Sequence, residues 1–172
     1  MQTASKAYPG KLFLKKALLA GLLAGTLDAI AAIINYYAVT GKSPVIVFEY
    51  IASGVFGKQA YTDGAPYAIF GLLFHFLIAM IFAVFYFWIY PTTTFLQKNS
   101  LASAILYGIF IWLVMNLLIV PLFISHTWTF HVTKVLLAMF ILIVCIGIPV
   151  SFLASSFYKK NRYGKAYDQT GI

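Results

Sequence analysis

One acidic residue, Asp28, lies in the middle of the first long apolar stretch, Ala17–Val39, and it constrains the fold more than any other feature. At about 1.5 Å of rise per residue, this stretch is about 34 Å long as an α-helix, enough to cross a hydrocarbon core of about 30 Å. Asp28 would then lie near the midplane, where a charge is costly. We therefore expect it to be protonated, or paired with His75 or Asn116 on another helix.

The helical face that carries Asp28 is composed of small and polar residues. Gly21 and Gly25 precede Asp28 on this face and Asn35 follows it, whereas the rest of the helix is rich in Leu and Ile. The face is therefore predicted to pack against protein. The spacing of the two glycines lets a second backbone approach closely, which is how membrane helices gain contact.

The composition of the chain is that of an integral membrane protein. Hydrophobic residues make up 62% and charged residues 9% of the sequence, against about 25% charged in soluble domains. Transmembrane helices are predicted at about residues 17–39, 67–90, 101–124 and 135–157. We expect an all-α bundle of four transmembrane helices forming one domain over residues 1–172. Because so small a bundle encloses only a narrow pocket, we expect a homo-oligomer or a partner membrane subunit.

A fifth, shorter helix is predicted at about residues 44–57, between the first two spans. Ser43 and Pro44 supply an N-cap and a proline at the first helical position. The segment is too short to cross the bilayer, so it is interfacial or re-entrant. If the helix is re-entrant, its acidic residue Glu49 reaches the outward-facing polar region between the helices. If the helix lies on the membrane surface, Glu49 is a solvated charge.

The basic residues predict the topology. The net charge is +8, and nine of the twelve Lys and Arg residues fall in residues 1–16, 92–100 and 158–172, which four spans place on one side. Both termini are therefore predicted to be cytoplasmic, with anionic lipid headgroups as partners. Nucleic acid is not expected as a partner. The first apolar run is longer than that of a signal peptide, so we expect it to be retained as a span.

Polar residues from three spans are predicted to share the outer half of the bilayer. His75 and Asn116 lie about 5 Å, and Asn35 about 10 Å, from the midplane toward the outer face. These residues and Asp28 form either a binding or proton-relay site or interhelical hydrogen bonds that only hold the bundle together. If they form a binding or proton-relay site, we expect Asp28 and His75 to line one cavity, or to be bridged by no more than one water or side chain.

The sequence gives little support for a metal site, a disulfide or an enzymatic active site. His126 and His131 are five residues apart, which does not place two ligands on one helical face, so no metal site is expected. The single cysteine, Cys145, excludes an intramolecular disulfide. No nucleophile elbow, phosphate loop or paired-cysteine motif is present, so no catalytic residue is assigned, no cofactor is expected, and an enzyme has no positive support.

Three segments, LLAGTLDAIAAI (22–33), YIASGVFG (50–57) and GLLFHFLIA (71–79), resemble a group of small bacterial inner-membrane proteins of unknown function. The resemblance implies a bacterial plasma membrane and four spans, but no activity and no residue roles. The leading hypothesis for function is transport, permeation or solute binding at an outward-facing polar site around Asp28 and His75. The alternatives are a structural or accessory subunit of a membrane complex and, third, a haem- or quinone-binding protein.

Overall fold

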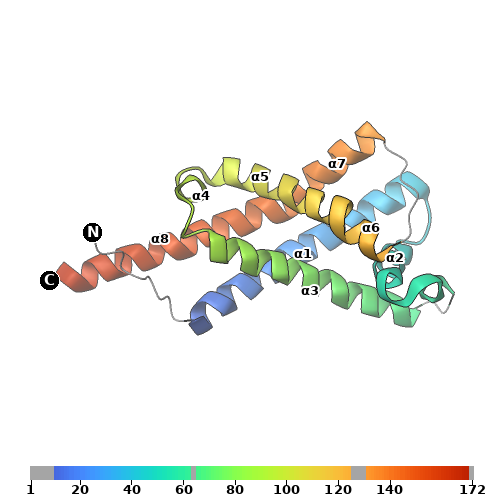
Figure 1. Cartoon of the computed structure of the whole chain (residues 1–172), viewed down its shortest axis with the longest axis horizontal. Coiled ribbons are helices and arrows are strands. Elements are labelled where there is room, and N and C mark those ends of the chain that lie inside the picture. Colours follow the sequence, from blue (N-terminus) through green and yellow to red (C-terminus); the bar gives the residue numbers. More distant parts are fainter. Residues whose placement is uncertain (1–9, 63–64, 125–130, 171–172) are drawn as a thin grey trace.

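The computed structural model describes residues 10–62, 65–124 and 131–170, and within these ranges the chain is helical, with no strand. Four helical segments are long and apolar enough to cross a membrane, which confirms the predicted all-α, four-span fold (Figure 1). In chain order the elements are α1 (Gly10–Thr40), α2 (Val45–Phe56), η1 (Gly57–Tyr61), α3 (Ala65–Ile89), α4 (Thr94–Lys98), α5 (Ser100–Leu113), η2 (Val114–Ile119), α6 (Val120–Phe123), α7 (Val132–Leu142), η3 (Ile143–Gly147) and α8 (Ile148–Thr170). The third span is α5–η2–α6, and the fourth is α7–η3–α8.

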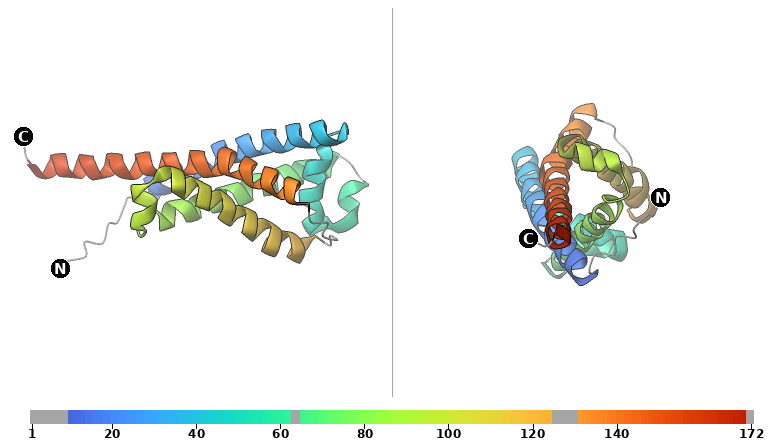
Figure 2. Two further views of the ribbon diagram at one scale, coloured as in Figure 1. Left: turned by 90° about the horizontal axis from the view of Figure 1, so that it is seen from above. Right: turned by 90° about the vertical axis from the view of Figure 1, so that its left-hand side faces the viewer.

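The first and fourth spans extend beyond their predicted bounds. α1 begins at Gly10, so Lys11, Lys15 and Lys16 belong to the helix, although the first span was predicted to begin at about residue 17. Lysine is a good helix former, and the apolar run that follows lets the helix continue through it. The fourth span likewise continues as α8 past Phe157, beyond the other helices (Figure 2).

The buried core lies in one half of the bundle. We call this half the α4 end, because it carries α4, and the opposite half the α2 end (Figure 1). The buried core side chains come from the beginning of α1, the end of α3, the middle of α5, and η3 with α8: Ala17, Ala20, Ala24, Phe82, Ala83, Tyr86, Phe87, Tyr90, Tyr107, Ile111, Ile146, Val150, Ala154, Phe157 and Tyr158. The α2 end is packed mainly through half-buried side chains.

Two close helix crossings hold the spans together. Where α1 crosses α3, a Cβ atom added at Gly21 would lie 2.7 Å from Met80 Cα, and one added at Gly25 would lie 3.0 Å from Ala79 Cβ. The prediction that this glycine pair admits a second backbone is therefore confirmed. The second crossing joins α5 to η3, where a Cβ added at Gly108 would lie 2.7 Å from Ile143 Cα.

The short helix α2 has 12 residues and packs against α3 at the α2 end (Figure 2). Its predicted cap is wrong: Pro44, not Ser43, is the residue at the N-cap position. The proline ring already holds a helical φ of −74°, and its carbonyl accepts a hydrogen bond from Val47 N–H at 3.0 Å, so the first turn starts one residue later than expected.

Because 12 residues rise only about 18 Å, α2 should not cross the bilayer. Cysteines placed at Lys42 and Lys58 in a Cys145→Ser background should therefore react with a membrane-impermeant maleimide from the same side of sealed vesicles. A cysteine at Lys98, in α4, should react from the opposite side. Labelling of Lys42→Cys and Lys58→Cys from opposite sides would mean five spans.

Candidate functional site

His75 is anchored by a hydrogen bond between two spans. Its Nε2 atom, on α3, is 2.8 Å from the carbonyl oxygen of Gly25 on α1. A carbonyl oxygen can only accept, so Nε2 carries the hydrogen and donates it. This bond fixes the orientation of the imidazole and leaves Nδ1 as the nitrogen that can gain or lose a proton.

Asp28 lies one helical turn after Gly25 and is half-buried. Its carboxyl group is close enough to the imidazole of His75 for their charges to interact. The structure thus brings together an acid and a base from different spans, both of which the sequence placed in the outer half of the bilayer. Three hollows of the bundle are lined by other residues, so none of these three is the expected shared cavity.

Two aromatic rings surround the imidazole of His75. The ring of Phe48, on α2, meets it edge to face at a centroid distance of 6.4 Å, and that of Phe76 at 5.5 Å. α2 comes this close because Gly71 of α3 has no side chain: a Cβ there would collide with the carbonyl group of Phe48. The short helix therefore covers His75 from the α2 end.

A third polar group near Asp28 is the thiol of Cys145, which the sequence analysis considered only for disulfides. Cys145 lies on η3, which packs against α1, and its half-buried thiol interacts electrostatically with Asp28. Cys145 could have been found from its depth in the membrane, since it lies near the middle of the fourth span, just as Asp28 lies near the middle of the first.

Both π-helical segments, η2 and η3, come just before a proline, Pro121 or Pro149. A proline provides no N–H, and its ring clashes with the carbonyl four residues earlier, which in each case lies inside the π segment. The helix therefore widens to i→i+5 bonding, as in the bond from Val120 N–H to the Met115 carbonyl. Such π turns are frequent at functional sites, and η3 contains Cys145.

The remaining predicted site residues are not drawn into one cluster. The amide of Asn116 donates to the carbonyl of Trp112 at 3.0 Å, so the bond expected between helices is made within its own helix. Asn35 is half-buried on α1, two turns beyond Asp28. Glu49 is half-buried on α2, next to the residue that contacts His75.

No metal centre is evident in the part of the chain that the structure describes, where no group of three or more His, Cys, Asp and Glu side chains could hold an ion. His131 is exposed at the N-terminus of α7, away from the bundle interior that holds His75. His126 lies outside the described residues.

An apolar hollow of about 320 Å³ opens at the α2 end between α2, α3 and the η2–α6 segment. It is lined by Tyr50, Ile51, Gly54, Val55, Phe74, Leu77, Ile78, Met115, Ile119, Val120, Phe123 and Ile124. Burial raises the pKa of the Tyr50 phenol above its usual value of 10.0, so this side chain stays neutral. The lining therefore carries no charge at neutral pH.

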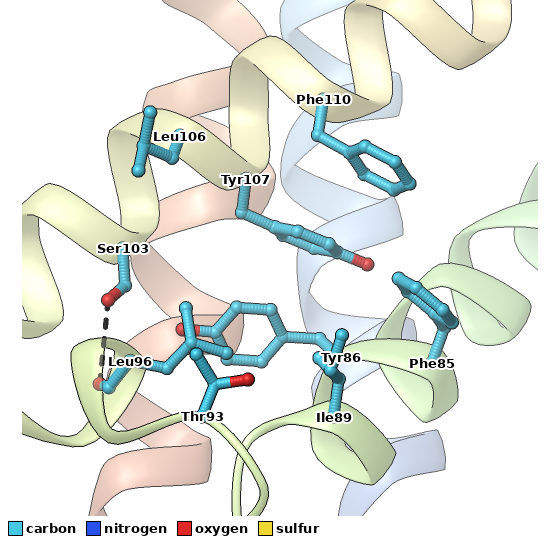
Figure 3. A pocket seen from close by; sticks show the side chains of 9 residues that line it. All are labelled: Phe85, Tyr86, Ile89, Thr93, Leu96, Ser103, Leu106, Tyr107 and Phe110. Atoms are coloured by element: carbon cyan, nitrogen blue, oxygen red, sulfur yellow. Dashed lines mark hydrogen bonds between the residues drawn. The ribbon is translucent and has the colours of Figure 1, made fainter.

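Four tyrosines, which we call the tyrosine layer, join three helices at the α4 end: Tyr86, Tyr90, Tyr107 and Tyr158. Their interhelical hydrogen bonds run from Tyr107 to the Phe82 carbonyl (2.5 Å), from Tyr158 to the Phe87 carbonyl (2.7 Å) and from Tyr86 to the Ser151 hydroxyl (3.0 Å). Two of the rings, those of Tyr86 and Tyr107, border a hollow of about 240 Å³ between α3 and α5 (Figure 3). This layer was not predicted from the sequence, where acidic, histidine and amide side chains were the only polar groups considered within the helices.

Comparison with known proteins adds no family to this picture. No family model matches the chain, and no curated protein or solved structure is significantly similar to it.

Proposed function

We propose that the chain is a small transport or permeation protein that binds and relays a proton at Asp28 and His75. The observation that carries this proposal is that a carboxyl group and an imidazole from two packed spans lie within electrostatic range of each other in the membrane-crossing part of the bundle. Ionisable residues at this depth are costly, and where they occur they commonly mark proton relays and substrate pathways.

The anchored imidazole suits this role. Its Nε2–H is held by the Gly25 carbonyl, so the ring keeps its place while Nδ1 takes up or releases a proton. Asp28, within electrostatic range, stabilises the imidazolium when the ring is charged, and accepts the proton when the ring is neutral. The pair can thus hold one proton on either of its two groups.

We place the chain in a bacterial plasma membrane with both termini in the cytoplasm and the α2 end facing outward. Among the side chains that the structure describes, lysines are more numerous at the α4 end: Lys11, Lys15, Lys16, Lys98, Lys159 and Lys160, against Lys42, Lys58 and Lys134 at the α2 end. This distribution supports a cytoplasmic α4 end by the positive-inside rule.

A structural or accessory subunit of a membrane complex is the rival proposal. It is favoured by the tyrosine layer, whose hydroxyl groups hold the helices together without serving a site. In that case Asp28 and His75 are also packing devices, and the chain acts through a second copy or another membrane subunit.

The proposal is tested by proton flux into proteoliposomes that contain a trapped pH-sensitive dye, driven by a potassium diffusion potential with valinomycin. Wild-type protein should acidify the lumen faster than protein-free vesicles. His75→Gln should lower this rate at least tenfold, because the glutamine amide can still donate to the Gly25 carbonyl but cannot carry a proton.

His131→Gln provides the matched control, since it removes an exposed histidine outside the bundle interior and should keep the wild-type rate. Wild-type flux in a folded His75→Gln protein, or wild-type protein no faster than protein-free vesicles, would favour the accessory-subunit proposal.

A further inference from the structure

A groove with two lysines at one end runs along the outer surface of α1 at the α4 end. It has a volume of about 480 Å³ and is formed by α1 with one residue of α3. Its lining consists of Lys11, Leu14, Lys15, Leu18, Leu19, Leu22 and Met80, and we call it the lysine–leucine groove. It shares no lining residue with the site of Asp28 and His75.

The length of the groove matches one leaflet of a bilayer. From Lys11 to Leu22 the helix rises roughly 16 Å, about half of a hydrocarbon core of about 30 Å. The two lysines lie near the N-terminus of α1, at the edge of its apolar stretch. From there the leucines continue toward the middle of the membrane. A molecule that fills the groove must therefore have a polar end at headgroup level and an apolar chain below it.

The charge at the polar end is positive. Lys11 and Lys15 are one helical turn apart, and both side chains are exposed. The first acidic residue along α1 is Asp28, beyond the far end of the groove. Two ammonium groups with this spacing suit an anionic phosphate group, and each lysine near an anionic surface strengthens attraction roughly fivefold.

We propose that the lysine–leucine groove binds one anionic phospholipid, with its phosphate between Lys11 and Lys15 and an acyl chain along the leucines. A second copy of the chain fits the groove less well, because a two-fold interface would bring the lysines of one copy toward those of the other. The site is independent of the proposed proton relay and holds even if Asp28 and His75 carry no proton.

The test measures the melting temperature of the purified protein in a non-ionic detergent with added lipid. Phosphatidylglycerol should raise it more than phosphatidylcholine with the same acyl chains. The double variant Lys11→Gln/Lys15→Gln should need at least tenfold more phosphatidylglycerol for the same rise. The matched control Lys159→Gln/Lys160→Gln removes the same charge from exposed α8 positions and should respond like wild type.

The acyl chain is tested separately with Leu18→Trp, which fills the groove but keeps both lysines and should also weaken the response. Equal shifts with the two lipids, or equal losses in the two lysine variants, would overturn the proposal. A full shift with glycerol phosphate, which has no acyl chain, would mean that the lysines bind phosphate alone and would overturn the lipid assignment.

Discussion

Asp28→Asn is expected to abolish proton flux in proteoliposomes and to leave the melting temperature of the protein in detergent unchanged or higher. An amide has nearly the same size as a carboxyl group, and its oxygen can still accept hydrogen bonds, but it cannot release a proton. It also removes a charge that the bundle would otherwise have to bury, and that burial is costly. The variant should therefore lose proton flux without losing stability. Replacement of a residue with a purely structural role would not remove the flux alone.

Thr26→Val is the control for this variant. Thr26 is exposed two residues before Asp28, and its hydroxyl donates to the Leu22 carbonyl of the same helix at 2.8 Å. Its loss should not change the flux. Asp28→Leu is less informative, because it removes the partner of His75 and can unfold the bundle for unrelated reasons. A folded Asp28→Asn protein with wild-type flux would show that this carboxyl is not the working group, and the accessory-subunit proposal would then lead.

A single added methyl group at Gly147 should have the largest effect on stability. A Cβ there would collide with the carbonyl oxygen of Ala104, a backbone atom of α5 that cannot move without separating α5 from η3. Overpacking of this kind typically costs about 1–3 kcal/mol. Gly147→Ala should therefore lower the free energy of unfolding, measured by titration with sodium dodecyl sulfate, by at least the lower of these values.

Gly54→Ala is the matched substitution. A Cβ at Gly54 would lie 3.4 Å from Phe123 Cβ, an ordinary van der Waals contact. This variant should unfold at the same detergent fraction as wild type. If Gly147→Ala were equally stable, the close crossing of α5 and η3 would not be a feature of the folded protein in detergent.

The sequence was sufficient for the number and position of the spans, since long apolar runs have few alternatives to crossing a membrane. It also identified the helix face that carries Gly21, Gly25 and Asp28, because small and polar residues recur there with the helical period. The sequence predicted a similar depth for Asp28 and His75, but depth alone could not show that the two side chains face each other.

The third and fourth spans were harder to predict, because each contains a π segment. An i→i+5 turn holds one more residue than an α turn, so the face on which a later side chain lies can no longer be counted from the first half of the span. Asn116 lies inside such a segment and bonds its own helix. Cys145 lies in the other π segment. It comes close to α1 because η3 packs against that helix, and the local sequence pattern does not predict this packing.

The uneven packing of the bundle has a consequence for the direction of access. The tyrosine layer fills the α4 end with buried rings and hydrogen bonds between helices, whereas the α2 end is packed mainly through half-buried side chains. We therefore expect water to reach Asp28 and His75 from the α2 side. Release of a proton on the other side would require hydrogen bonds of the tyrosine layer to open, among them those from Tyr107 and Tyr158 to carbonyl oxygens of α3.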